Sequence, residues 1–66
     1  MKHAATDFVE VVPALPLYQA EQAWEEWKSE HPRVLTHLEA DDIRRDIICT
    51  TDYRTLVRYR IRKTTL

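Results

Sequence analysis

The sequence predicts a small α+β domain in which one amphipathic helix packs on an antiparallel sheet, in the order β-α-β-β-β. Apolar residues recur every three or four positions between 17 and 31, which is the period of a helix buried on one side. Apolar and basic residues alternate between 55 and 63, which is typical of a half-buried strand. The 66 residues are enough for one domain, which we expect to span 1–66 with frayed ends at 1–6 and 64–66.

The composition is that of a globular protein and excludes several kinds of functional site. Hydrophobic residues make up 44% and charged residues 32% of the chain, which is ordinary for a globular protein. Glycine is absent, which excludes the phosphate-binding loops, dinucleotide fingerprints and nucleophile elbows that need glycine. The longest mostly apolar run, 11–18, is interrupted by prolines and falls short of the roughly 20 residues of a membrane helix. A lone Cys49 and no signal-peptide pattern predict a cytoplasmic protein with no membrane partner.

Charge is distributed unevenly along the chain. Three basic and nine acidic residues give residues 1–42 a charge of −6, and seven basic and two acidic residues give residues 43–66 a charge of +5. The total is −1, so no general attraction to nucleic acid or to an acidic membrane follows. The split predicts either a dipolar surface or two halves that neutralise each other in the fold.

The amino-terminal half predicts one strand and one helix. Residues 7–12 are rich in β-forming residues and end at Pro13, and residues 13–16 are an extended connector because proline disfavours helix in the residue before it. Pro16 suits the first turn of a helix that covers 17–31 and stops at Pro32. The apolar stripe of this helix consists of Leu17, Ala20, Ala23, Trp24 and Trp27.

The middle of the chain has a less distinct pattern. Residues 33–39 alternate and predict a strand. Residues 40–51 fit a helix with a capping box at Thr36 and Glu39, or a strand preceded by a turn at Asp41–Asp42. We favour the strand, because the apolar run from 47 is short and β-rich.

Residues 55–63 predict a strand with two distinct faces. Thr55, Val57, Tyr59 and Ile61 share one face, which we expect to lie beneath the tryptophan stripe, and Leu56, Arg58, Arg60 and Arg62 share the other. A helical alternative would group Tyr53, Leu56, Val57 and Ile61. Because glycine and asparagine are absent, tight type I′ hairpins are disfavoured and longer loops are expected at Asp41–Asp42 and at Asp52.

Three arginines on one strand face are the first candidate binding site. Arg58, Arg60 and Arg62 would project guanidinium groups at intervals of about 6.6–6.8 Å, and such groups bind phosphate oxygens in bidentate fashion. Tyr53, Tyr59, Arg44 and Arg45 could add stacking or charge. The alternative, which we favour, is a solvated or edge face that cross-strand carboxylates such as Asp46 or Glu39 neutralise.

The aromatic residues also have two interpretations. We favour a helix face buried in the core for Trp24 and Trp27, and the alternative in so small a domain is a partly exposed patch that docks a partner. His3, His31, His37 and Cys49 match no common metal-ligand spacing, so we expect neither a metal nor another cofactor. Adjacent carboxylates such as Asp41 and Asp42 point apart, and no catalytic constellation is present in the sequence.

These observations predict a small non-enzymatic protein-interaction or regulatory module that self-associates as a homodimer or binds another protein. Its expected anchors are Trp24, Trp27 and Tyr59, and its expected charged contacts are Arg58, Arg60 and Arg62. The alternative is a single-stranded nucleic-acid binder that uses the same three arginines. A third hypothesis is a regulator whose acidic helix, with Glu21, Glu25 and Glu26, occupies a basic site on a partner.

Overall fold

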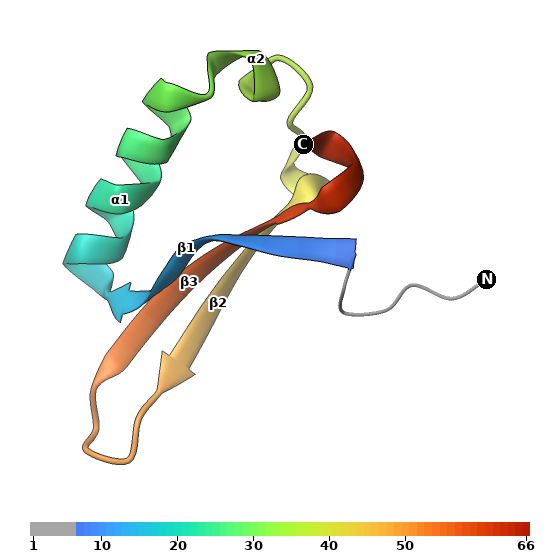
Figure 1. The fold of residues 1–66 in the computed structure, drawn as a ribbon. Coiled ribbons are helices and arrows are strands. Elements are labelled where there is room, and N and C mark those ends of the chain that lie inside the picture. Colours follow the sequence, from blue (N-terminus) through green and yellow to red (C-terminus); the bar gives the residue numbers. More distant parts are fainter. Residues whose placement is uncertain (1–6) are drawn as a thin grey trace.

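A three-stranded antiparallel sheet lies against one long helix in the computed structural model, which describes residues 7–66 (Figure 1). The strands are β1 (Phe8–Pro16), β2 (Ile43–Cys49) and β3 (Thr55–Arg62), and the long helix is α1 (Leu17–Glu30). A short helix α2 (Pro32–Leu35) and two 3₁₀ turns, Ala40–Asp42 and Lys63–Thr65, complete the chain. The α+β class, the single amphipathic helix and the antiparallel sheet are thus confirmed. The fraying expected at 1–6 lies outside the described residues.

The last strand in sequence is the central strand of the sheet, because the order is β1-β3-β2. Val57, Tyr59 and Ile61 are buried on the face of β3 that α1 covers, and the arginines between them lie on the other face. The alternation predicted for 55–63 is therefore confirmed, and the strand itself ends at Arg62.

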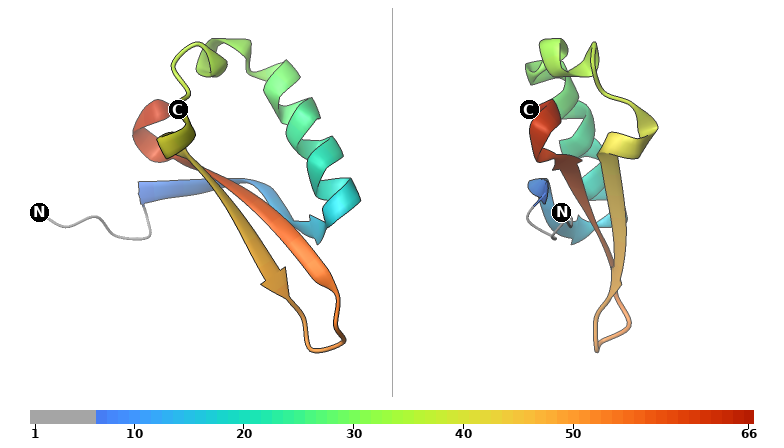
Figure 2. Two further views of the ribbon diagram at one scale, coloured as in Figure 1. Left: turned by 180° about the vertical axis from the view of Figure 1, so that it is seen from behind. Right: turned by 90° about the vertical axis from the view of Figure 1, so that its right-hand side faces the viewer.

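The core lies between α1 and the two strands β1 and β3. Its buried members are Val12, Ala20, Trp24, Val57, Tyr59 and Ile61. Trp24 and Ala20 come from the predicted helical stripe, so the predicted packing of the helix on β3 is confirmed. The described chain is only 15 Å thick along its shortest axis, which corresponds to one helix layer on one sheet layer (Figure 2).

Strand β1 is longer and less regular than the strand expected over 7–12. It continues through the predicted connector to Pro16, and its pairing with β3 is interrupted between Glu10 and Val12 and again between Val12 and Leu15. Proline removes a donor from the ladder, so Pro13 and Pro16 are tolerated because β1 lies at an edge of the sheet.

The strand expected over 33–39 is wrong, because residues 32–35 form the helix α2 and turns follow it. Pro32 is the first helical residue. An N–H at this position makes no hydrogen bond within the helix, so proline, which lacks that N–H, is tolerated there. Val34 and Leu38 are four residues apart, which is also a helical spacing. Both are half-buried, and Leu38 packs against the core. The structure therefore has one strand fewer than the sequence predicted.

The strand interpretation of residues 40–51 is confirmed, with an earlier start than the expected position 47. Asp41 and Asp42 lie in a 3₁₀ turn and β2 follows from Ile43. A capping box forms between Glu39 and Asp42, in place of the pair Thr36 and Glu39 considered for a helix.

The β2–β3 hairpin has a longer loop that contains Asp52, as predicted. The Thr50 hydroxyl donates to the Asp52 carboxylate, and the Tyr53 N–H donates to the Thr50 carbonyl at 3.1 Å. Tyr53 adopts a left-handed conformation with φ 66°, a position that glycine or asparagine normally occupies. The hairpin tip projects beyond the helix in every view (Figures 1 and 2).

Candidate interaction surfaces

The arginine face of the sheet is neutralised from within the chain. Arg58 lies directly opposite Asp46 in the β2–β3 register, and its Nε is 3.1 Å from Asp46 Oδ2. Arg60 Nε donates to the same oxygen at 2.8 Å, and Arg60 Nη2 lies 3.3 Å from Oδ1. Asp46 was one of the two carboxylates named from the sequence as neutralising partners, and this pairing is found.

The third arginine has a partner that the sequence did not indicate. Arg62 Nε donates to Asp42 Oδ1 at 3.0 Å, and its Nη2 donates to the Asp41 carbonyl at 3.1 Å. The 3₁₀ turn before β2 brings Asp42 beside the end of β3, whereas the other named candidate, Glu39, uses its side chain in the capping box. A turn at Asp41–Asp42 was predicted, but its place beside the end of β3 depends on the pairing of β2 with β3, so Asp42 was not selected as a partner from the sequence.

Both carboxylates have lowered pKa values. The pKa of Asp42 is lowered mainly because the Glu39 N–H donates to its Oδ2 at 3.1 Å, with Arg62 adding a hydrogen bond and a positive charge. Partial burial raises the pKa of Asp46, but hydrogen bonds from Arg60 and Arg58 and their charges outweigh burial, so the net shift is downward. Both groups are therefore charged at neutral pH and hold their arginines in place.

Arg44 differs from the other arginines on this face of the sheet. It is exposed and lies directly opposite Arg60, a like-charged neighbour, and among residues 7–66 it has no carboxylate partner. Its guanidinium is 4.8 Å from the centre of the Phe8 ring, and the Arg62 guanidinium is 5.0 Å from the same ring. Phe8 belongs to no motif in the sequence, and only the β1–β3 pairing brings it to this face.

The predicted aromatic anchors form a stack that begins inside the core. Trp24 lies parallel to Tyr59 at a ring distance of 4.6 Å and parallel to Trp27 at 5.6 Å, and Trp27 stacks on His31 at 4.2 Å. Trp24 is 9% exposed and Tyr59 is 5% exposed, so neither has a large surface to offer a partner. Trp27 is half-buried, and His31 Nδ1 donates to the Trp27 carbonyl at 2.8 Å. The core interpretation of the two tryptophans fits this geometry better than the docking interpretation.

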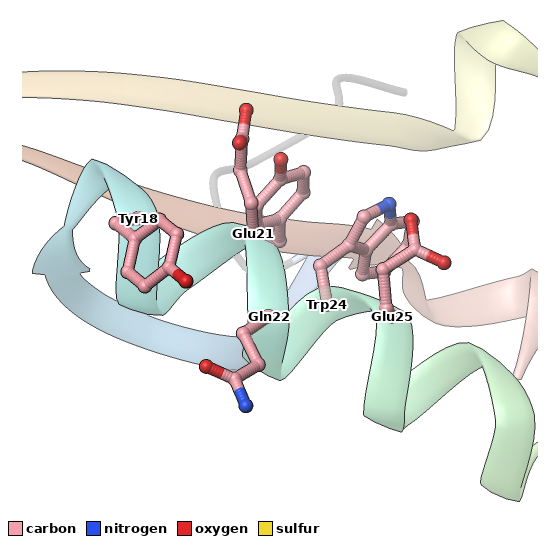
Figure 3. A pocket seen from close by; sticks show the side chains of 6 residues that line it. Tyr18, Glu21, Gln22, Trp24 and Glu25 are labelled. Atoms are coloured by element: carbon pink, nitrogen blue, oxygen red, sulfur yellow. The ribbon is translucent and has the colours of Figure 1, made fainter.

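An open groove borders α1 on its β2 side. It has a volume of about 490 Å³, with Trp24 and Tyr59 among its lining residues. Figure 3 shows Glu21 pointing from α1 towards β2, and Gln22 pointing the other way. Arg45 of β2 donates from Nε to the Tyr59 hydroxyl at 3.3 Å and its Nη2 lies 3.7 Å from Glu21, so it contacts two of the residues that line the groove.

The apolar surface beside this groove is exposed. Ile47 of β2 is 62% exposed and Tyr18 of α1 is 82% exposed, although Ile47 is on the sheet face that carries the core. The reason is that α1 packs mainly on β1 and β3 and leaves most of β2 uncovered. We call Ile47, the outer edge of β2 and this groove the β2 surface.

No metal or membrane feature is found in the part of the chain that the structure describes. Within residues 7–66, no group of three or more His, Cys, Asp and Glu side chains could hold a metal ion. No helix among the same residues is long and apolar enough to cross a membrane. Comparison of the chain with known protein families, with curated proteins and with solved structures finds no match.

Proposed function

We propose that this chain is a small, non-enzymatic protein-interaction module that self-associates through the β2 surface. The observation that carries the proposal is an unpaired, regular sheet edge beside uncovered apolar side chains. The single cysteine, Cys49, is exposed in β2 and supports a reducing, cytoplasmic setting. The proposal moves the main contacts away from Trp24, Tyr59 and the three arginines, because those residues are engaged within the fold.

The two edges of the sheet differ in how well they are protected against pairing. Strand β1 has two register irregularities and two prolines, which are features that prevent a further strand from adding. Strand β2 is paired with β3 in unbroken register from Ile43 to Cys49 and has no proline or bulge, and its charged residues are confined to Arg44, Arg45 and Asp46. No strand among the described residues pairs with its outer edge. An exposed edge of this kind favours pairing with another strand.

The side chains of the β2 surface support the same conclusion. A monomeric small domain gains nothing from exposing Ile47 on the core side of the sheet, whereas a partner strand would cover it. The core is also thin, as expected for a chain that buries only about 60% of its unfolded surface. Association would extend this core sideways across β2.

The test is the association state of the purified chain. Sedimentation equilibrium across a dilution series is expected to show a reversible dimer at tens of micromolar. This concentration corresponds to a binding free energy of about −7 kcal/mol or stronger. Ile47→Lys places a charge at the edge and is expected to raise the dissociation constant of the dimer at least about tenfold. Val9→Lys is the matched control, because Val9 is an exposed β-branched residue on the protected strand β1. A strict monomer, or equal effects of the two lysines, would contradict the proposal.

The nucleic-acid alternative has less support. Single-stranded nucleic-acid binding through Arg58, Arg60 and Arg62 would have to compete with Asp46 and Asp42 for each guanidinium. The acidic-helix hypothesis retains exposed carboxylates on α1, but Glu21 already lies beside Arg45. Self-association therefore has more support than the nucleic-acid and acidic-helix hypotheses.

A further inference from the structure

We propose that the partner is a second copy of this chain, paired antiparallel through β2 about a two-fold axis at Arg45, so that Arg44 of each copy lies opposite Asp46 of the other. This inference rests on the proposed function and specifies the partner and the register. The result is a continuous six-stranded sheet with both α1 helices on the same face, because a two-fold axis perpendicular to the sheet keeps each face on its own side.

The hydrogen-bonding pattern of the hairpin identifies which backbone groups are available. The Thr50 N–H donates to the Arg54 carbonyl at 2.9 Å, so Thr50 belongs to a hydrogen-bonded pair with Arg54. Hydrogen-bonded and non-hydrogen-bonded pairs alternate along an antiparallel ladder. The even residues of β2 therefore point their backbone groups towards β3, and the odd residues point theirs outward. The outward groups belong to Ile43, Arg45, Ile47 and Cys49.

Symmetry leaves three registers in which at least five residues of each β2 strand overlap, and these are centred on residue 45, 46 or 47. The register centred on Asp46 places two carboxylates opposite each other, which is unfavourable. The register centred on Ile47 pairs the two Ile47 side chains but places Asp46 opposite Ile48. The register centred on Arg45 forms two Arg44–Asp46 pairs on one face and two Ile43–Ile47 pairs on the other. It is the only one of the three registers that pairs opposite charges, although it also places the two Arg45 residues opposite each other.

Arg44 and Asp46 each have capacity for this contact. Arg44 is exposed, lies opposite Arg60, and lacks a carboxylate partner among residues 7–66. Its guanidinium lies over the Phe8 ring of β1 at 4.8 Å, so the contact requires this side chain to turn from Phe8 towards the outer edge of β2. In Asp46, Oδ2 takes the shorter contacts from Arg58 and Arg60, whereas Oδ1 receives one contact at 3.3 Å. A carboxylate oxygen accepts two hydrogen bonds, so Oδ1 has room for a donor from the second copy.

The two Arg45 residues at the centre of the register are of like charge, but each is held by its own chain. Arg45 donates to the Tyr59 hydroxyl, and its Nη2 lies 3.7 Å from Glu21, so its guanidinium is turned towards α1. A carboxylate accompanies each guanidinium, which reduces the repulsion between the two copies. The apolar pair of Ile47 with Ile43 of the second copy, on either side of this centre, covers the most exposed aliphatic side chain of the β2 surface.

Charge reversal at Arg44 tests the paired residues. In sedimentation equilibrium, Arg44→Glu is expected to weaken dimerisation at least about tenfold, because it replaces two attractive cross-strand pairs by two repulsive ones. Arg54→Glu is the matched control, since it changes the net charge equally and Arg54 lies at the exposed hairpin loop. Equal dissociation constants for the two variants would overturn the assigned register.

Disulfide trapping tests the register directly and separates it from self-association. In a Cys49→Ser background, Arg45→Cys is expected to form a covalent dimer on mild oxidation, because residues at the two-fold axis have Cα atoms about 5.5 Å apart. Ile47→Cys is expected to cross-link much more slowly. If sedimentation shows a dimer but Ile47→Cys is trapped faster, the register is wrong and the proposed function stands. If the unmodified chain is a monomer, both proposals fail.

Discussion

Asp46 connects two arginines of the central strand, and replacing it by asparagine tests whether its charge stabilises the fold. Four nitrogen–oxygen contacts of 2.8–3.3 Å join this carboxylate to Arg58 and Arg60. Asp46→Asn keeps the size of the side chain and one acceptor oxygen, but removes the negative charge. Two positive side chains are then left next to each other on β3.

The magnitude follows from the exposure of these side chains. Exposed ion pairs contribute about 0.2–1 kcal/mol and buried charged hydrogen bonds about 1.5–3 kcal/mol. The three side chains are 25–33% exposed, which lies between the two cases. We therefore expect Asp46→Asn to lower the free energy of unfolding at neutral pH by about 2 kcal/mol, roughly 1 kcal/mol for each arginine. A chain of this length has a total stability of about 3–10 kcal/mol, so the loss is readily measured.

Urea denaturation followed by tryptophan fluorescence is the assay, performed in the Ile47→Lys background so that dimerisation does not add to stability. The pKa of Asp46 is lowered in the folded state, so its contribution is present above the unfolded value of about 3.9 and is lost as the pH falls through the folded pKa. The difference between Asp46 and Asp46→Asn should therefore shrink towards zero in acid. An equal difference at neutral and acidic pH would show that the charge is not responsible.

Three further predictions concern the core, the hairpin and the arginine face. Trp24→Ala should lower the free energy of unfolding by about 3–5 kcal/mol in urea denaturation, because it removes a buried ring stacked on Tyr59 and Trp27; a loss below 1 kcal/mol would argue against Trp24 as a core residue. Tyr53→Gly should raise the melting temperature, since it relieves a left-handed conformation that costs about 1–2 kcal/mol for residues with a Cβ; a lower melting temperature would contradict this. Fluorescence anisotropy with a single-stranded oligonucleotide should show no binding at moderate salt, because Arg58 and its neighbours are paired with carboxylates; affinity that rises steeply as salt is lowered would restore the nucleic-acid alternative.

Local pattern determined the parts of the fold that were predicted correctly. The alternation around Val57, Tyr59 and Ile61 specified which side of β3 is buried, and the spacing of Ala20 and Trp24 specified the helix face that covers it. The cross-strand neutralisation of the arginines by Asp46 was available as an alternative because charged pairs commonly lie opposite each other in sheets.

The parts that were missed depend on which strands become neighbours. The order β1-β3-β2 leaves β2 at an edge, and neither composition nor periodicity specifies that order. The positions of Phe8 beside Arg44 and of Asp42 beside Arg62 follow from the same pairing. Residues 33–39 alternate as a strand would, but Pro32 begins a helix there, and the outer edge of β2 is left unpaired among residues 7–66. The β2 surface was therefore not visible as a candidate site.

The position of β3 in the middle of the sheet has a kinetic consequence. Phe8 pairs with Arg62, so closing the β1 side joins two ends of the described chain that lie 54 positions apart. The β2–β3 hairpin closes a loop of only a few residues and needs no such search. The order of assembly should therefore run from the hairpin outward, with β1 and the helix docking last and setting the folding rate. Until they dock, both sides of the hairpin are open, and it is in this interval that pairing with the wrong strand competes with correct folding.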